Sequence, residues 1–313
     1  MSERIVLGRS GLEVSPICFG TWQLSARFWG DVAEADVIAA VRRAYEVGVN
    51  FYDTAGAYGD GRAESVLGEA VAPLPRDRIV IATKVFHHFY PDGRRHGDLS
   101  GKYVTEYCDE ALARLRTDYI DLYQLHSFDP FTPLEETTAA LDKLRQAGKI
   151  RCYGVSNFSV EQLRLARRYG DYATCQPLYN LLDARVEWDL LPYCAAEHIG
   201  VLVYSSLAWG MLTGKFDGSE TFTDLRAGNP RFQGERFKRL AGNIRSLQPM
   251  ADKYGLTITQ LCLAATLAHP AIHCAIVGIK KPSHIEEAAA AMGKTIDRQD
   301  YFTIRGKLHD HRP

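Results

Sequence analysis

Residues 49–59 read Val-Asn-Phe-Tyr-Asp-Thr-Ala-Gly-Ala-Tyr-Gly: a short strand-like run, an acidic residue at its end, and a tyrosine in the turn that follows. Two further strand-like runs, 79–82 and 119–124, lead in the same way to a lysine and to a histidine. The ends of consecutive strands in a parallel barrel open on one face, where such proteins place their chemistry. The side chains that we expect to converge there, called the tetrad below, are Asp53, Tyr58, Lys84 and His126.

The tetrad combines groups that adjust one another's acidity. A phenol titrates near ~10, so it donates a proton poorly at neutral pH. A neighbouring ammonium favours the phenolate, so Lys84 is expected to lower the pKa of Tyr58, while the carboxylate of Asp53 holds the ammonium in place. A phenol tuned in this way acts as a general acid, and the reaction that this combination indicates is carbonyl reduction.

Strand-like and helix-like segments alternate along the chain. The strand candidates, short and rich in β-branched or aromatic residues, are 17–22, 49–54, 79–84, 119–125, 151–155, 173–178, 201–206 and 274–278. The helix candidates lie near 33–47, 62–72, 101–116, 134–147, 159–169, 186–198, 258–268 and 283–291. Eight strands that alternate with helices fit a closed (β/α)8 TIM barrel, an α/β fold, better than an open sheet. No G-x-G-x-x-G sequence follows a strand, so the fingerprint of an open dinucleotide-binding sheet is missing.

The length of 313 residues fits a single barrel domain over 1–313. An N-terminal β-hairpin, with arms at 5–7 and 14–16, is expected to close the barrel floor. Segments longer than ordinary loops are expected on the face that holds the tetrad, where they would form a substrate pocket and cover a cofactor. These segments are 23–32, 85–100, 127–133 and 207–235.

Composition excludes several classes of protein. Hydrophobic residues at 46% and charged residues at 24% are ordinary globular values. A net charge of −1 gives no electrostatic case for binding nucleic acid or an anionic membrane. The seven cysteines include no C-x-x-C pair and are interpreted as reduced, buried thiols. No apolar signal core follows the first residues, so a cytoplasmic protein is expected.

Segment 85–100 contains three histidines, His87, His88 and His96, which raises the question of a metal. Adjacent histidines in a strand-end segment point to opposite sides, and we see no acidic or cysteine partner at ligand spacing. A polar pocket wall is the preferred interpretation, and the sequence predicts no metal site. His269 and His273 are interpreted as loop or core residues for the same reason.

Several blocks of the sequence stand in an order typical of one known family. Residues 7–15 read Leu-Gly-Arg-Ser-Gly-Leu-Glu-Val-Ser, and residues 120–126 read Ile-Asp-Leu-Tyr-Gln-Leu-His. Shorter blocks are Gly-Thr-Trp at 20–22, Gly-Val-Ser-Asn-Phe at 154–158, Gln-Pro-Leu-Tyr-Asn at 176–180, Leu-Thr-Gly-Lys at 212–215 and Pro-Arg-Phe at 230–232. One block alone is weakly specific, but together and in order they are strongly so. The chain resembles the aldo-keto reductases from residue 7 to about residue 290.

The resemblance implies a role for each tetrad residue. Tyr58 is expected to protonate the carbonyl oxygen while hydride arrives from the nicotinamide, and Lys84 is expected to lower the pKa of the phenol. Asp53 would orient Lys84, and His126 would donate a hydrogen bond to the substrate oxygen. Taken singly, these residues have ordinary structural explanations: a turn cap, a loop aromatic, a lysine at a strand end and a core histidine. The family spacing of all four favours the chemical interpretation.

The resemblance also implies binding residues. The expected cofactor contacts are Gly20, Thr21, Trp22, Asp53, Ser156, Asn157, Gln176, Tyr204, Ser205, Leu207, Gly210, Leu212, Lys215, Val277, Gly278, Ile279, Lys280, His284 and Glu287. Within this set, Tyr204 would stack on the nicotinamide ring. The expected substrate contacts are Trp22, Phe28, Trp29, Tyr58, Phe86, His87, His126 and Phe128.

The adenosine end departs from the family pattern. Trp209, His284 and Ala288 stand where arginine, arginine or glutamine, and asparagine are common. Arginine suits a 2′-phosphate through its bidentate fork, but Lys280 and Lys281 can still supply positive charge. The expected cofactor is NADP(H), with NAD(H) as the less favoured alternative.

Two other classes of function remain open from the sequence. The first is an NADP-binding regulatory subunit with little turnover, like the family members that accompany ion channels, although the intact tetrad argues against it. The second is a barrel lyase that uses Lys84 as a Schiff-base amine, which Asp53 disfavours by keeping the lysine charged. The expected partner is a small carbonyl or polyol, and the polar residues of segment 85–100, His87, His88, Arg94 and Arg95, favour a hydroxylated one such as a sugar.

Overall fold

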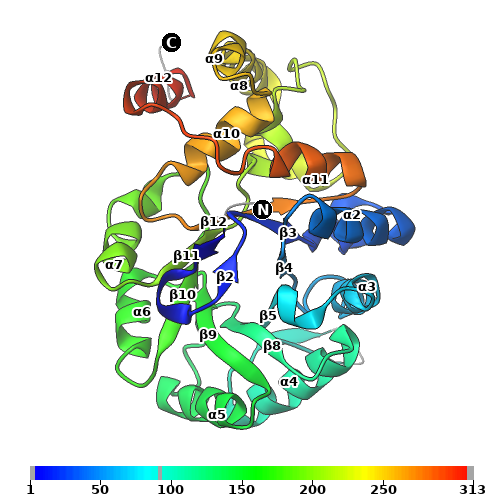
Figure 1. Ribbon diagram of the computed structural model, residues 1–313, viewed down its shortest axis with the longest axis vertical. Helices are drawn as coiled ribbons and strands as arrows, with labels where there is room; N and C mark the ends of the chain where they lie inside the picture. The colour runs from blue at the N-terminus through cyan, green and yellow to red at the C-terminus, as the bar shows by residue number, and fades with distance from the viewer. Residues whose placement is uncertain (1–3, 91–93, 309–313) are drawn as a thin grey trace.

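Eight parallel strands close into a barrel in the computed structural model of the chain (Figure 1), which describes residues 4–90 and 94–308. Each neighbouring pair is parallel, which confirms the expected (β/α)8 barrel. In order around the barrel the strands are β10 (Tyr172–Gln176), β11 (Gly200–Val203), β12 (Cys274–Gly278), β3 (Ile17–Gly20), β4 (Phe51–Asp53), β5 (Val80–Val85), β8 (Ile120–Leu125) and β9 (Ile150–Ser156).

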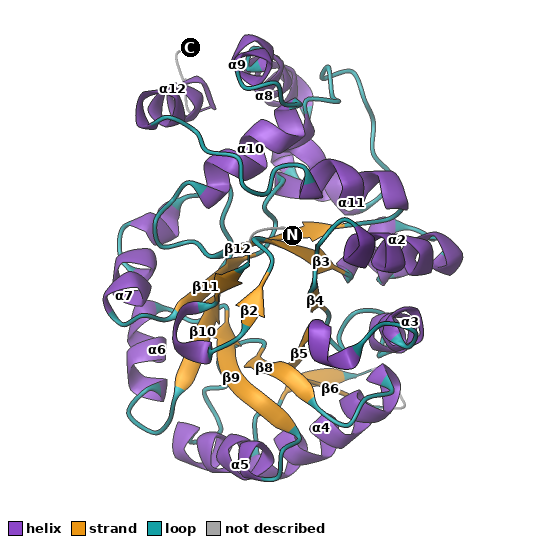
Figure 2. Cartoon of the chain, viewed as in Figure 1, coloured by secondary structure: helices purple, strands orange, loops and turns teal. Residues whose placement is uncertain are grey.

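One helix follows each barrel strand or its loop, and these helices surround the strands (Figure 2). They are α2 (Glu34–Glu46), α3 (Arg62–Val71), α4 (Gly101–Leu115), α5 (Leu134–Gln146), α6 (Val160–Ala166), α7 (Leu190–Ala196), α10 (Ile258–Leu267) and α11 (Pro282–Ala289). Local sequence fixes where some of them begin. Ser159 and Thr257 both form capping boxes, in which the side chain and a glutamine three residues on satisfy each other's backbone amides.

The N-terminal hairpin closes the barrel floor, as expected. It pairs β1 (Ile5–Val6) with β2 (Glu13–Val14). The first arm is one residue shorter than predicted, and the second begins one residue earlier and ends two residues earlier than predicted. Its side chains Leu7 and Leu12 are buried and pack with residues that point into the barrel. In Figure 1 the hairpin lies across the end of the barrel, opposite the strand ends that carry the tetrad.

Three of the expected long loops carry structure of their own. Segment 85–100 contains an antiparallel pair, β6 (His87–Phe89) and β7 (Arg95–Gly97), in place of an open loop. Segment 207–235 contains three short 3₁₀ helices, and segment 23–32 contains another together with α1. These elements are η2 (Trp22–Leu24), α1 (Ala26–Trp29), η5 (Ala208–Thr213), η6 (Leu225–Gly228) and η7 (Pro230–Phe232).

Additional helices lie outside the eightfold ring and were not expected: α8 (Gly234–Arg245), α9 (Gln248–Lys253) and α12 (Arg298–Leu308). In α8 the side chains Phe237, Ala241 and Ile244 follow helical spacing and are buried against α10 and the η5 segment. Within residues 4–90 and 94–308, none of the helices combines the length and the apolar character needed to cross a membrane.

Candidate active site

The tetrad residues come together at the carboxyl ends of consecutive strands, as the sequence predicts. Asp53 ends β4, Lys84 lies in β5, His126 directly follows β8, and Tyr58 lies in the turn before α3. The ammonium of Lys84 donates hydrogen bonds to Asp53 Oδ1 at 2.6 Å and to Tyr58 Oη at 3.4 Å. The rings of Tyr58 and His126 meet edge to face with centroids 6.0 Å apart.

Burial opposes the expected lowering of the pKa of the Tyr58 phenol. The pKa of Tyr58 is raised, because burial outweighs the nearby Lys84 ammonium, which alone would lower it. Lys84 therefore acts in the expected direction, but burial has the larger effect on this pKa. Burial would also lower the pKa of Lys84, but the charges and hydrogen bonds of Asp53 and Tyr58 outweigh it and raise that pKa. The lysine is therefore held as a cation.

His126 is a neutral imidazole at pH 7. Burial, followed by the charges of Lys84 and His87, holds the pKa of His126 well below its usual value. The ring of His87, from β6, lies 5.4 Å from the His126 ring, so the β6–β7 hairpin reaches the tetrad. A neutral imidazole has one N–H donor and one acceptor nitrogen. His126 can thus donate a hydrogen bond to a neutral oxygen, or to an oxygen on which negative charge develops, without adding a charge of its own.

The residues expected to hold a carboxamide form a hydrogen-bonded group beside the tetrad. Gln176 Nε2 donates to Asp53 Oδ2 at 2.9 Å, and Ser156 Oγ donates to the Gln176 carbonyl. Tyr204 Oη donates to Asn157 Oδ1 at 2.8 Å. Through these bonds the side chains of strands β9 and β10 fix the orientation of Asp53 and of the Tyr204 ring.

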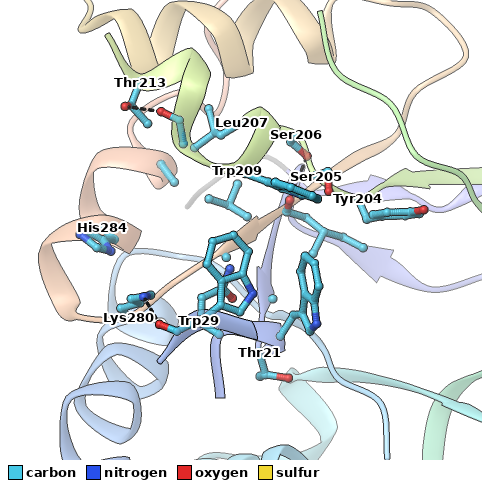
Figure 3. A pocket seen from close by; sticks show the side chains of 18 of the residues that line it. Thr21, Trp29, Tyr204, Ser205, Ser206, Leu207, Trp209, Thr213, Lys280 and His284 are labelled. Atoms are coloured by element: carbon cyan, nitrogen blue, oxygen red, sulfur yellow. Dashed lines mark hydrogen bonds between the residues drawn. The ribbon is translucent and has the colours of Figure 1, made fainter. Parts of the chain in front are cut away.

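A cavity of about 390 Å³ opens between the tetrad and α11 (Figure 3), a volume typical of small-ligand sites. The expected cofactor and substrate residues that line it are Gly20, Thr21, Trp22, Trp29, Asp53, Tyr58, Tyr204, Ser205, Leu207, Gly210, Lys215, Val277, Gly278, Lys280, His284 and Glu287. Others lining it were not expected as contacts: Gln23, Ser206, Trp209, Thr213, Arg226, Thr259, Ile276 and Ala288.

Several expected contacts lie elsewhere. The side chains of Leu212 and Ile279 are buried in the two largest core clusters, so only their backbone is available to a ligand. Phe128 packs edge to face on Phe158, and Phe86 packs against the core and fills the space beside Gly97. Their assignment as substrate contacts stays a prediction that the cavity does not support, because neither lines it.

Aromatic rings form one wall of the cavity. Trp22 and Trp29 meet edge to face at 5.2 Å, and Trp209 lies 6.5 and 6.3 Å from them. Phe28 packs against Trp22 at 5.8 Å behind this wall. Trp29 and Trp209 come from segments far apart in the sequence, and Figure 3 shows both facing the cavity.

Cationic side chains gather at the α11 end. The pKa values of Lys215 and Lys280 are both lowered, first by burial and then by the positive charge of Arg226. Burial and the neighbouring lysines also lower the pKa of His284. Arg226 is paired with Asp224 at 2.5 Å and lies 4.3 Å over the Phe222 ring. Arg226 was not predicted as a cavity residue, because a single arginine in a long loop belongs to no periodic pattern in the sequence.

The backbone around the cavity is locally strained. Asn157, Ser205, Ala208 and Trp209 all have positive φ, between 47° and 59°, a region that non-glycine residues rarely adopt. Residues held in this way persist where the surrounding structure determines them, and they cluster at functional sites. The residues with positive φ lie in the loops that follow β9 and β11, and these loops border the cavity.

Comparison with known proteins identifies the class of protein to which this barrel and its tetrad belong. The sequence pattern of the Aldo/keto reductase family matches residues 16–309. The chain is 38% identical over 306 residues to the aldo-keto reductase YhdN of Bacillus subtilis, covering 96% of this chain and 92% of that protein. It is 32% identical to the NADH-specific methylglyoxal reductase of Escherichia coli, covering 97% of each.

Solved structures support the same assignment. The structure of the glycerol dehydrogenase AKR11B4 from Gluconobacter oxydans superposes with a TM-score of 0.89 at 31% identity, covering 96% of this chain and 94% of that one. An aldo/keto reductase from Klebsiella pneumoniae, in complex with NADP and acetate, superposes with a TM-score of 0.76 at 31% identity, covering 100% and 98%. This chain belongs to the aldo/keto reductase family.

Proposed function

We propose that this protein is an NADPH-dependent oxidoreductase that interconverts a carbonyl compound and an alcohol, with Tyr58 as the general acid. The observation that carries the proposal is the position of the Lys84 ammonium, 2.6 Å from Asp53 Oδ1 and 3.4 Å from Tyr58 Oη. Both of these partners line the cavity. Because Lys84 donates to the phenol oxygen, the phenol's own proton is free to be donated to a substrate.

The tetrad then acts on the carbonyl oxygen from two sides. Tyr58 donates its proton to the oxygen as negative charge develops there, and Lys84 stabilises the phenolate that remains. His126, neutral and beside Tyr58, donates a hydrogen bond to the same oxygen. Asp53 keeps Lys84 charged and in place. The reverse reaction uses the phenolate as the base that accepts the alcohol proton.

The cavity residues fit a nicotinamide cofactor, which supplies the hydride when bound. Gln23 Oε1 and Trp29 Nε1 are buried polar atoms of residues in the cavity wall. Neither atom has a hydrogen-bond partner among residues 4–90 and 94–308, and a polar ligand could supply one. Gly278 gives Gln23 its room, since a Cβ there would lie 1.7 Å from the Gln23 amide nitrogen. Tyr204 offers a ring for stacking close to the tetrad.

The preference for NADPH rests on the cationic end of the cavity. Burial first, and the positive charge of Arg226 second, lower the pKa values of Lys215 and Lys280. A phosphate bound beside these lysines would offset the repulsion from Arg226. The relatives do not decide the point, since one was solved with NADP and another is NADH-specific.

For the substrate we propose a small hydroxylated carbonyl compound or the matching polyol. The rings of His87 and His126 lie 5.4 Å apart. Arg95 pairs opposite Phe89, which is two residues from His87, so Arg95 and His87 lie on the same face of the hairpin. These polar groups suit hydroxyl groups beside the reacting carbon. His88, expected to join them, lies on the other face. The relative named as a glycerol dehydrogenase is consistent with this class.

The test is turnover on a panel of aldehydes, ketones, sugars and polyols with NADPH and NADH, followed by cofactor absorbance at 340 nm. We expect turnover with a hydroxylated member of the panel and a lower KM for NADPH than for NADH. Tight NADPH binding with negligible turnover on every member would contradict the catalytic proposal and favour a regulatory subunit. A product trapped by borohydride on Lys84 would favour the lyase.

A further inference from the structure

Three side chains that can bind a metal converge on the outer face of the β6–β7 hairpin. His88 of β6 pairs directly opposite His96 of β7 in the antiparallel register. Directly opposed residues of such a pair point to the same face, with their Cβ atoms ~4.5–5.5 Å apart. Asp98 follows His96 by two residues and lies on that face as well, beside His88. The hairpin register, and not nearness in sequence, brings the three together.

Their ligand atoms stand close to the spacing that a metal ion requires. Asp98 Oδ2 lies 3.3 Å from His88 Nδ1 and 3.9 Å from His96 Nε2, and one ligand atom from each residue falls within 4.8 Å of the others. Ligand atoms ~2.0–2.2 Å from a tetrahedral zinc ion lie about 3.3–3.6 Å from one another. The His88 and His96 rings stack with centroids 5.0 Å apart and 26° between their planes, so the His96 ring must rotate for both nitrogens to face one ion.

Neighbouring groups hold two of the three side chains in place. The His88 ring stacks on Tyr103 of α4 with centroids 4.4 Å apart and an interplanar angle of 4°. Asp98 Oδ1 accepts the Ser100 amide at 2.8 Å, which leaves Oδ2 facing the histidines.

We propose that His88, His96 and Asp98 bind one divalent transition-metal ion, with zinc as the ion that this ligand set favours, and that water fills the remaining coordination position. Imidazole nitrogens suit zinc, copper and nickel, whereas magnesium and calcium bind oxygen ligands. No metal site was predicted from the sequence. His87 and His88 lie on opposite faces of β6, as expected, but Asp98 is an acidic partner that was not expected.

The ion would act on the substrate pocket through the hairpin. His87 is adjacent to His88 and lies on the opposite face of β6, with its ring 5.4 Å from that of His126. A metal that ties β6 to β7 therefore holds the strand that carries His87 against the catalytic residues. This consequence does not depend on the proposed reaction, because metal binding and the order of the hairpin can be measured without turnover.

The test uses full-length protein without a histidine tag, freed of metal with a chelator and dialysed. Zinc is titrated in competition with a chromophoric chelator, and cobalt is added separately because its visible absorption reports nitrogen and oxygen ligands. We expect one zinc per chain, cobalt bands that zinc abolishes, and hydrogen exchange at residues 87–89 and 95–97 that slows when zinc binds.

Matched variants locate the ion. His96→Gln and Asp98→Asn should each weaken zinc binding by at least the roughly 10–100-fold seen when even an outer partner of a metal ligand is removed. His198→Gln, at an exposed histidine before β11 on the opposite end of the barrel, should leave zinc affinity unchanged. Less than one zinc per chain, an equal loss in His198→Gln, or equal binding of magnesium would overturn the proposal.

Discussion

Lys84 and Asp53 form a buried ion pair at the ends of adjacent strands, with 2.6 Å between Nζ and Oδ1. The side chain of Lys84 is fully shielded from solvent and that of Asp53 is 4% exposed. Lys84 also donates to the Thr54 carbonyl at 2.9 Å, so the ammonium is oriented from two sides. Buried charges of this kind contribute little net stability, since desolvation offsets their attraction. Their position beside Tyr58 is consistent with the catalytic role proposed above.

Lys84→Met should therefore reduce carbonyl turnover and shift its pH dependence. Without the ammonium nothing opposes burial, so the pKa of Tyr58 should rise further and the alcohol-oxidation limb that needs phenolate should move to higher pH. The unpaired carboxylate should also destabilise the fold by about 3–5 kcal/mol. Asp53→Asn, which leaves the ammonium, serves as the comparison. A pH–rate profile of Lys84→Met that matches the wild type would rule out the coupling.

Stability should fall as the pH is lowered from about 7 to about 5.5. Burial is the first cause that lowers the pKa values of His87, His126, His269, His273 and His284. In the unfolded chain these groups protonate near ~6.5, so below that pH the unfolded state binds more protons and is favoured. Urea unfolding at several pH values measures this, with a slope of up to ~1.4 kcal/mol per pH unit for each such histidine.

The slope should become shallower in His126→Asn, because one strongly shifted group is removed. A free energy of unfolding that stays constant over this pH range, or an unchanged slope in the variant, would mean that the buried histidines are protonated in the folded protein.

Arg114→Met should destabilise the fold strongly. Arg114 Nε lies 2.6 Å from Glu64 Oε2, and the Glu64 side chain has no exposure to solvent. Removing the arginine leaves a buried carboxylate without its main partner, which costs about 3–5 kcal/mol. Arg116→Met is the control, since its 3.8 Å contact with Glu69 is exposed and such pairs contribute at most ~1 kcal/mol. Similar losses in both variants, measured by urea unfolding, would contradict this.

Cofactor selectivity should depend on Lys280. Its ammonium lines the cavity 3.4 Å from the Trp29 carbonyl, beside the charge of Arg226 (Figure 3). Lys280→Ala should weaken NADPH by about 1–3 kcal/mol, the range of hydrogen bonds to charged groups, and leave NADH unchanged. Lys281→Ala, next to it and exposed, should change neither. Fluorescence titration with each cofactor measures these affinities. Equal losses of affinity for NADPH and NADH in Lys280→Ala would mean that Lys280 does not bind the 2′-phosphate.

The sequence predicted the barrel and the tetrad because both depend on local patterns. A parallel strand ends where its β-branched run ends, and those ends place Asp53, Lys84 and His126. Tyr58 lies in the turn that follows the strand of Asp53. The β6–β7 hairpin was missed because its strands are three residues long and rich in histidine and arginine. The grouping of His88 with Asp98 depends on the register of that hairpin, which no spacing in the sequence reveals.

Contacts carried by irregular segments were also beyond the sequence. Arg226 reaches the cavity from a 3₁₀ helix in a long loop, and Gln23 reaches it by packing on Gly278. Family spacing placed Leu212 and Ile279 near the cofactor, but it gives only the position along the chain. Whether a side chain points to the cavity or to the core is decided by packing.

The most direct test of the proposed chemistry is single-turnover hydride transfer in Tyr58→Phe, followed at 340 nm with saturating NADPH and a carbonyl substrate that the wild type reduces. Phenylalanine keeps the ring that packs against His126 and removes only the hydroxyl. We expect the rate to fall by at least ~10²-fold, the effect of losing a general acid, while NADPH affinity stays within about twofold of wild type. A variant that keeps most of the wild-type rate would contradict the role of Tyr58 as the acid.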